Sequence, residues 1–527
     1  MSEPTLQKKN MKVSTVVFMI FCICAAGAYG LEAMIPSAGP GLTIAMIIVI
    51  PLIWSLPLAL VCAELGAERP IAGGAYRWVQ ESMGEFWGFQ CGWWKILTAV
   101  VDPTIYIILA GGYIGYIFQI PSIWIYIFQI IAILVFVFIN LRGLKEVGIV
   151  STILSMTVLA LFALIAIVGF INWKTSPFEP FTIPGQPVIF GIGSAICIGL
   201  WMFSGYEQIS ALTGEVEDPK VIPKATLLAL PLVVLCYLLP TVGGLASVGQ
   251  WESWSPEMGG VGYGTVLIEN LGPAFGIIFG IVAVIAQLSM FNTSLTNGSR
   301  VFYAMADDNM FPKAFAKISK KGNVPAVGIV TIGIIDILLC SLDFGVVVVI
   351  DVMLILSFHI LLFITAIRMR KSIPDEERPI KIPGGDGFFT FICIVPIAVA
   401  ILSYLINGTD YFLFGSIALA TGPIFYIICK RAFGGLKDKF PMDPRTKLEK
   451  GALKQFGFAM LIFGLFAFVG RVFLQWYEGD WGPGYYMDTY GFDCFQTFLN
   501  GIVIFGVVAI VLAIIGFVAS KVLEEKK

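Results

Sequence analysis

Apolar stretches long enough to cross a lipid bilayer recur along the whole of this 527-residue chain. A transmembrane helix needs about 20 mainly apolar residues, and about fourteen stretches of the chain meet that requirement. Hydrophobic residues make up 58% of the sequence and charged residues only 13%, which is too little charge to cover the surface of a soluble protein. The sequence therefore predicts an all-α polytopic membrane protein. The predicted spans are 13–36, 41–65, 84–117, 122–141, 147–171, 187–213, 224–248, 272–305, 324–342, 344–369, 387–407, 410–430, 452–475 and 497–520.

Lysine and arginine residues predict how these spans are oriented. If the N-terminal segment 1–12 lies inside, every even-numbered loop is also inside. Of the 33 lysine and arginine residues, only Lys174 and Arg471 then fall outside, with Lys95 assigned to the inner side. This asymmetry follows the positive-inside rule. We expect both termini to be cytoplasmic and the protein to be integral to the cell membrane.

Glycine interrupts two of the apolar stretches. Residues 27–30 read Gly-Ala-Tyr-Gly within the first stretch, and residues 203–205 read Phe-Ser-Gly within the sixth. Each break is followed two residues later by an acid, Glu32 or Glu207. Backbone polar groups that a break leaves unpaired in a bilayer need partners. Two breaks with adjoining acids favour a solute-binding site over glycines that serve only helix packing.

The positions of the two breaks divide the chain. They fall in the first and sixth spans, so residues 13–171 and 187–370 form two groups of five helices. An odd number of helices per group places the second group upside down relative to the first, which predicts an inverted repeat with a binding site near the midplane. Segments 387–430 and 452–520 carry no such break. We expect these last helices to form a scaffold, a lipid-facing support or an oligomer contact.

Three parts of the chain carry motifs of a known family. They are Ala63-Glu64-Leu65 with residues 70–76, Phe203-Ser204-Gly205-Tyr206-Glu207 with residues 214–219, and residues 299–306. In order, they resemble the second-helix, sixth-helix and eighth-helix motifs of the amino acid–polyamine–organocation permeases, and together the resemblance covers roughly residues 15–370. The resemblance implies the five-plus-five inverted-repeat fold, also called the LeuT-like fold, and transport by alternating access.

The first break also bears on the substrate. Amino acid permeases of this family usually carry a small hydroxylated residue there, and the break holds the substrate carboxylate at a helix N-terminus. Here Tyr29 and Glu32 stand in that region, in a pattern similar to the polyamine uptake branch. That branch also has an acid in the third helix shortly after a Trp-Lys pair, as Asp102 follows Trp94-Lys95 here. The resemblance favours uptake of polyamines or related organic amines, with an amino acid permease as the alternative.

Three acids at membrane depth, Glu32, Asp102 and Glu207, are the predicted partners of substrate ammonium groups. An uncompensated charge at a helix centre costs about 2.5–3.5 kcal/mol, which a bound cation or proton offsets. Glu207 is also predicted to carry the coupling proton. The full predicted substrate site is Gly27, Ala28, Tyr29, Gly30, Glu32, Asp102, Trp201, Phe203, Ser204, Gly205, Tyr206 and Glu207, whose aromatic rings supply cation–π contacts.

Two of these acids also have a structural interpretation. Asp102 precedes Pro103 and is placed to cap a local kink. Glu32 can pair with a helix end or face a vestibule. A third acid, Glu64, lies at the inner end of its span, where we expect it to join an internal-gate network.

Other polar residues of the apolar stretches carry weaker signals. Asp336 and Asp351 have no neighbouring glycine break, so we interpret them as packing or loop-facing groups. His359 is the only histidine of the chain. Although histidine can relay protons, a lone histidine in an apolar span is typically a hydrogen-bonded core residue.

A proton is the predicted coupling ion, and sodium is the second choice. In sodium-coupled relatives the ion lies between the broken first helix and hydroxyl groups of the eighth helix. The corresponding residues here are Asn292, Thr293, Ser294 and Thr296. Some proton-coupled family members instead place a lysine in the fifth helix, and the span 147–171 has none. Exchange rather than symport stays open.

Composition and motifs argue against other classes of protein. The net charge of −2 is not that of a nucleic-acid-binding protein. One histidine, no Cys-x-x-Cys and no His-Glu-x-x-His leave little for an enzyme or a metal site. A channel needs a filter loop or charged pore rings, which the sequence lacks. The expected partners are a small amine or amino acid, the lipid bilayer and, through the last helices, a second copy of the chain; no cofactor is expected.

Overall fold

The computed structural model of the chain is helical throughout the residues that it describes, which are 13–24, 27–69, 74–143, 148–209, 221–254, 261–319, 322–373, 378 and 380–524. In these ranges β-structure is limited to two isolated bridges, Trp254 with Val261 and Met442 with Glu449. The all-α fold class is therefore confirmed. The predicted N-terminal segment 1–12 and the motif residues 70–73 and 214–219 lie outside the described residues.

Within the described ranges, eleven helical segments are long and apolar enough to cross a membrane, and the protein is an integral membrane protein. They are Pro40–Glu68 (α3 Pro40–Ile50, η2 Pro51–Ser55, α4 Leu56–Glu68), Glu85–Phe118 (α6 Glu85–Ala99, α7 Asp102–Phe118), Ser122–Leu141 (α8), Ile153–Ile171 (in α9 Gly148–Ile171), Lys224–Val248 (in α12 Val221–Val248), Pro273–Asp307 (α14), Phe344–Ser372 (α16), Gly385–Ile406 (α17), Thr409–Phe433 (α18), Ala452–Glu478 (α19) and Phe495–Leu523 (α21). The predicted sixth and ninth spans coincide with shorter apolar helices, α10 (Val188–Met202) and α15 (Ala326–Leu339). Length and apolarity thus support eleven spans and not the full predicted set, because the remaining predicted spans are short or interrupted.

The first predicted span is broken where its glycines lie. Helix α1 (Val13–Cys24) ends before the break, and the chain resumes as η1 (Leu31–Ala33) and α2 (Met34–Ala38). Gly27 and Gly30 have φ angles of 107° and 85°, which residues with a Cβ rarely adopt. A Cβ atom on Gly30 would also lie 2.9 Å from the ring of Phe344. The break therefore requires glycine both for its backbone shape and for the approach of Phe344.

The sixth predicted span is interrupted in the same way. Helix α10 ends at Met202, Gly205 has a φ angle of 98°, and the short helix η3 (Tyr206–Ile209) follows. Both interruptions thus fall where the sequence places them.

A π-helical turn in the second span holds the second break. This turn, η2, begins at a proline, which lacks the N–H group needed for a regular helical bond. Trp54 Nε1 donates a hydrogen bond to Ser204 Oγ at 3.2 Å, and Ser55 Oγ donates to the Phe203 carbonyl at 2.9 Å. π-Helical turns are frequent at functional sites. Here the turn binds one hydroxyl and one carbonyl group of the interrupted segment.

The helices that carry acids pack around the two breaks. Helix α7 lies along α14, and α16 contacts α6, α7 and α10. Helix α12 packs against α1 and α9, and α4 packs against η3. Two short helices, α5 (Ala75–Met83) and α13 (Tyr263–Leu271), join α6 and α14, respectively. This packing brings side chains from distant parts of the sequence close to the two breaks.

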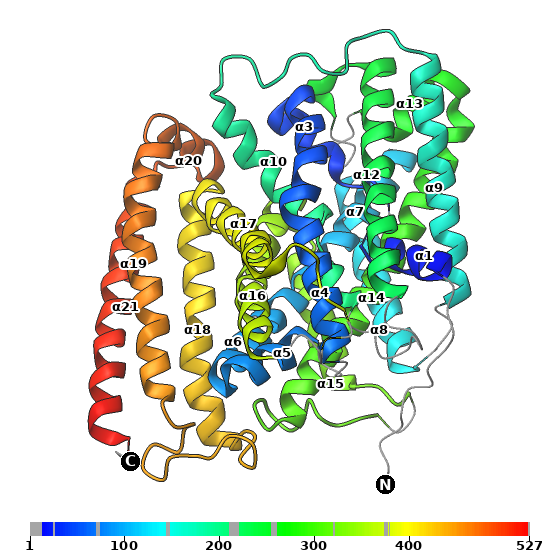
Figure 1. Cartoon of the computed structure of the whole chain (residues 1–527). Coiled ribbons are helices and arrows are strands. Elements are labelled where there is room, and N and C mark those ends of the chain that lie inside the picture. The colour runs from blue at the N-terminus through cyan, green and yellow to red at the C-terminus, as the bar shows by residue number, and fades with distance from the viewer. Residues whose placement is uncertain are drawn as a thin grey trace.

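The last helices stand at one side of the molecule (Figure 1), where α19 and α21 pack along each other and α18 connects them with α6 and α16. Between α19 and α21, the short helix α20 (Gly482–Tyr490) lies at the end remote from Leu523. The hydroxyl of Tyr486 in α20 lies 3.1 Å from Glu478 Oε2 and 3.3 Å from Asp410 Oδ1. This polar contact fixes α20 to the ends of α18 and α19.

Candidate functional site

Glu32 lies at the first break and is fully buried, with 0% of its surface exposed. Its Oε2 atom accepts hydrogen bonds from the Gly30 N–H at 3.2 Å and from the Tyr113 hydroxyl at 3.0 Å. Its Oε1 atom accepts a bond from the Tyr263 N–H at 3.3 Å. Tyr113 belongs to α7 and Tyr263 begins α13. The carboxylate therefore ties the first break to two other helices.

Aromatic rings surround the same break. The ring of Tyr29 lies 5.4 Å from Tyr113, 5.0 Å from Phe162 and 5.7 Å from Phe279, measured between ring centres. Tyr263 adds a further edge contact, 5.4 Å from Phe162. Such ring pairs stabilise one another, and their faces attract cations. A buried carboxylate within an aromatic cluster is suited to an ammonium group.

Glu207 follows the second break and contacts the only histidine. Its Oε2 atom lies 3.3 Å from His359 Nε2, and His359 is fully buried in α16. Trp54 packs edge-on against the imidazole with ring centres 5.4 Å apart. Lys95 Nζ lies 5.0 Å from the ring centre of Phe358. The same ammonium group is within electrostatic range of Glu207. His359 is thus a hydrogen-bonded core residue as expected, but its partner is a predicted site acid.

Asp102 is the first residue of α7. Its carboxylate accepts hydrogen bonds from the hydroxyls of Ser294 in α14 and of Tyr106, the latter at 3.4 Å. The Tyr106 ring lies 5.9 Å from Trp201, which brings α10 to the same place. No side-chain capping bond is present at the start of α7. These contacts therefore do not support the alternative in which Asp102 caps a local kink.

Asp336 and Asp351 are also fully buried, but their surroundings differ. Asp336 Oδ1 accepts a hydrogen bond of 2.8 Å from Thr104, so the packing interpretation holds for this residue. Among the described residues, neither oxygen of Asp351 has a hydrogen-bond partner. Asp351 lies within electrostatic range of both Asp102 and Glu207. The burial of Asp351 contradicts the loop-facing interpretation, and the packing interpretation stays a prediction.

The predicted ion-site residues of α14 bond mainly to α8. Asn140 Nδ2 donates to Asn292 Oδ1 at 2.7 Å, and Thr296 Oγ1 donates to Asn140 Oδ1 at 2.6 Å. Thr293 donates at 3.0 Å to a backbone carbonyl one turn earlier, and Ser294 binds Asp102. In the described part of the chain, these side chains bond to α7, α8 and α14 itself and not to the first break. Only Ser294 joins the acids.

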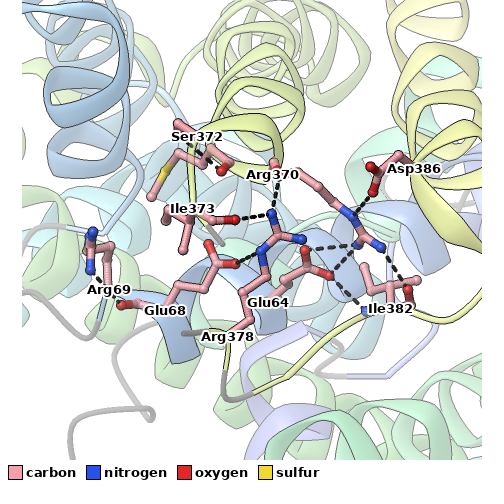
Figure 2. Close-up of polar contacts among 10 residues, drawn as sticks. Glu64, Glu68, Arg69, Arg370, Ser372, Ile373, Arg378, Ile382 and Asp386 are labelled. Atoms are coloured by element: carbon pink, nitrogen blue, oxygen red, sulfur yellow. Dashed lines mark hydrogen bonds and ion pairs between the residues drawn. The ribbon is translucent and has the colours of Figure 1, made fainter. Parts of the chain in front are cut away.

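A second charged cluster lies at the C-terminal ends of α4 and α16 (Figure 2). The Arg370 guanidinium reaches both oxygens of Glu64 at 3.0 and 2.9 Å and Asp386 Oδ1 at 3.1 Å. Arg378 Nε lies 3.3 Å from Glu68 Oε1. These contacts place Glu64 in a buried ionic network at a helix end, as the sequence predicts. The network joins the second span to α16 and to the segment that leads into α17.

Comparison with known proteins shows the family of the chain. Residues 11–428 match the family described as Amino acid permease. The chain belongs to this family. It is 32% identical to Polyamine transporter RMV1 of Arabidopsis thaliana over 397 residues, which cover 74% of the chain and 79% of the relative. It is 30% identical to Polyamine transporter PUT1 of Oryza sativa subsp. japonica over 409 residues, which cover 74% of the chain and 73% of the relative.

Family membership makes this protein a membrane permease and not an enzyme. Three residues that contact the predicted site acids were not among the predicted site residues: Tyr113 and Tyr263, which contact Glu32, and His359, which contacts Glu207. Tyrosine is too common in apolar spans for either tyrosine to stand out in the sequence. The sequence did contain a signal for Asp351, because an acid in the middle of an apolar span costs free energy and usually has a function.

Proposed function

We propose that this permease is a secondary active transporter that takes up polyamines or related organic amines, coupled to protons, by alternating access. The observation that carries the proposal is the burial of Glu32 at the first break, among aromatic rings. A carboxylate there repels a substrate carboxylate and attracts an ammonium group. The two relatives named as polyamine transporters support the same substrate class.

In this proposal the two breaks form the centre of an inverted repeat. Segments 13–171 and 187–370 are its halves, within a chain of about fourteen spans. Both termini face the cytoplasm, and the membrane is the cell membrane. Family membership and the interruption of the first and sixth helices support this arrangement. The Arg370–Glu64 network then lies at the cytoplasmic side and acts as the inner gate.

The acids have separate roles in the transport cycle. Glu32 and Asp102 bind ammonium groups, and Glu207 binds either an ammonium group or the coupling proton. Glu207 Oε2 lies 3.3 Å from the imidazole of His359, which can donate or accept a proton, and this contact supports the proton role. The remaining substrate-site residues at the two breaks supply backbone groups and aromatic faces. Ser294 supports Asp102, and Asn292, Thr293 and Ser294 are the candidate sodium ligands.

Transport assays in liposomes test the substrate class. The purified protein is reconstituted, and uptake of labelled putrescine and spermidine is measured in competition with alanine, leucine and arginine. We expect the diamine and the triamine to compete with each other and the amino acids to have no effect. Uptake of a labelled amino acid by the same liposomes, without uptake of either amine, would instead establish an amino acid permease.

Ion gradients test the coupling. An inward proton gradient is expected to drive amine uptake in the absence of sodium, and a protonophore is expected to stop it. A strict requirement for sodium would overturn proton coupling while leaving the substrate assignment intact. Uptake that needs amine on both sides of the membrane would show exchange.

A further inference from the structure

One face of α16 runs past both breaks and carries an acid between two aromatic residues. Phe344, Asp351 and Phe358 are spaced seven residues apart, and residues seven apart lie almost on the same side of an α-helix. Neighbours in this series are about 10 Å apart along the helix axis. All three side chains are buried, and Asp351 has 0% exposure. We call Phe344, Asp351 and Phe358 the α16 stripe.

Both ends of the α16 stripe touch predicted site residues. The ring of Phe344 lies against Gly30 of the first break and 5.7 Å from the ring of Trp201. At the other end, Phe358 lies under the ammonium group of Lys95. The stripe therefore extends from the first break to the surroundings of Glu207, and Asp351 is its central residue.

Titratable groups of three other elements lie within electrostatic range of Asp351. They are Asp102 and Tyr106 of α7, Glu207 of η3 and Cys197 of α10. On the same helix, His359 follows eight residues later, and Lys95 approaches from α6. The carboxylates of Asp102, Glu207 and Asp351 thus lie within electrostatic range of one another, and a bound cation or proton balances their charge.

Within this group Asp351 differs in its bonding. Asp102 accepts bonds from Ser294 and Tyr106, and Glu207 contacts His359. Neither oxygen of Asp351 accepts a bond from any described residue, although buried polar groups are nearly always paired. A buried acid with two unused oxygens is the strongest acceptor that the region offers to a ligand.

We propose that Asp351 binds an ammonium group of the transported amine and that, with Glu207 binding a second one, it makes the permease select substrates with two or more ammonium groups. This inference rests on the proposed amine transport. The aromatic residues on either side of Asp351 provide apolar and π surface for the methylene chain and its charged ends. Lys95 beside Phe358 shows that an alkyl ammonium group fits against the α16 stripe.

Binding measurements on the full-length protein in nanodiscs test the inference. Putrescine has two ammonium groups, and butylamine has the same carbon chain with one. The wild type is expected to bind putrescine more tightly than butylamine. Asp351→Asn is expected to weaken putrescine binding by about tenfold or more and butylamine binding much less, so that the preference is lost. Asp351→Asn with wild-type putrescine affinity and preference would overturn the inference.

Asp336→Asn is the matched control, because Asp336 is an equally buried aspartate whose carboxylate is bonded to Thr104. It is expected to keep the preference for putrescine. If Asp336→Asn loses the preference to the same degree, Asp351 has no special role and the inference fails. Absence of putrescine binding to the wild type would instead refute the proposed function, and this inference with it.

A second variant covers the case in which Asp351→Asn does not fold, as judged by its elution profile and thermal unfolding. Asp351→Glu keeps the carboxylate and moves it one methylene further into the site. It is expected to change the order of affinities among diamines of three, four and five carbons. An unchanged order would show that Asp351 does not touch the substrate and would overturn the inference.

Discussion

His359 Nε2 lies 3.3 Å from Glu207 Oε2, and this contact joins the middle of α16 to the segment that follows the second break. The two residues are 152 positions apart in the sequence. Alternating access requires the segments around a binding site to shift relative to one another. A contact between an imidazole and a carboxylate changes strength with each proton gained or lost. In the proposed proton-coupled cycle, this pair links proton binding to movement of the second break.

Replacing His359 tests this link. His359→Phe removes the polar contact with Glu207 while keeping an aromatic ring, and we expect putrescine uptake to fall by about tenfold or more, the scale of one charge-assisted hydrogen bond. His359→Gln retains an N–H donor, so putrescine uptake should fall less in this variant. Initial rates of uptake in liposomes, normalised to reconstituted protein, measure both. Equal rates for wild type and His359→Phe would contradict a role in transport.

Glu32→Gln tests the acid at the first break. It removes the charge but keeps an oxygen able to accept the hydrogen bonds from Gly30 and Tyr113. We expect amine binding to weaken by about tenfold or more. Tyr113→Phe removes one neutral donor and is expected to have a smaller effect, about fivefold. Direct binding of labelled putrescine gives both affinities, and an unchanged value for Glu32→Gln would make this acid structural.

Gly30→Ala tests the shape of the first break. The new Cβ meets Phe344 at 2.9 Å and sits on a residue with a φ angle of 85°. Strain of about 1–3 kcal/mol is expected, seen as a lower midpoint of thermal unfolding together with a loss of uptake. Gly345→Ala is the control, since its Cβ would meet nothing within 4 Å. If both variants behave like the wild type, the break tolerates a side chain and its glycine is not required.

A double-mutant cycle tests the pair of Arg370 and Glu64. Their side chains are 2% and 3% exposed, so removing one leaves the other charge buried without its bidentate partner. We expect each single alanine variant to lose about 3–5 kcal/mol of stability and the double variant to lose less than the sum. Thermal unfolding of the four proteins in detergent provides the comparison. Arg368→Ala, an exposed arginine on the same helix, should change little, and strict additivity would argue against a coupled pair.

Much of the fold could be predicted from the sequence because its signals are local. An apolar stretch of sufficient length forms a helix in lipid whatever its neighbours are. The breaks at 27–30 and 203–205 follow from glycines that adopt positive φ angles there. Glu32 follows Gly30 by only two residues, so its position beside the first break could also be predicted from the sequence. The predicted sixth and ninth spans are longer than the apolar helices found there, α10 and α15.

The class of the protein, the order of its helices, the two breaks and the acids next to them can all be read along the chain. The groups that those acids contact depend on how the helices pack. Glu207 contacts His359, and Asp351 is buried with no hydrogen-bond partner among the described residues. The physical reason is that the partner of a buried side chain depends on which face of its helix packs against which neighbour. That choice is made by helices far apart in the chain, and hydropathy along one helix does not encode it.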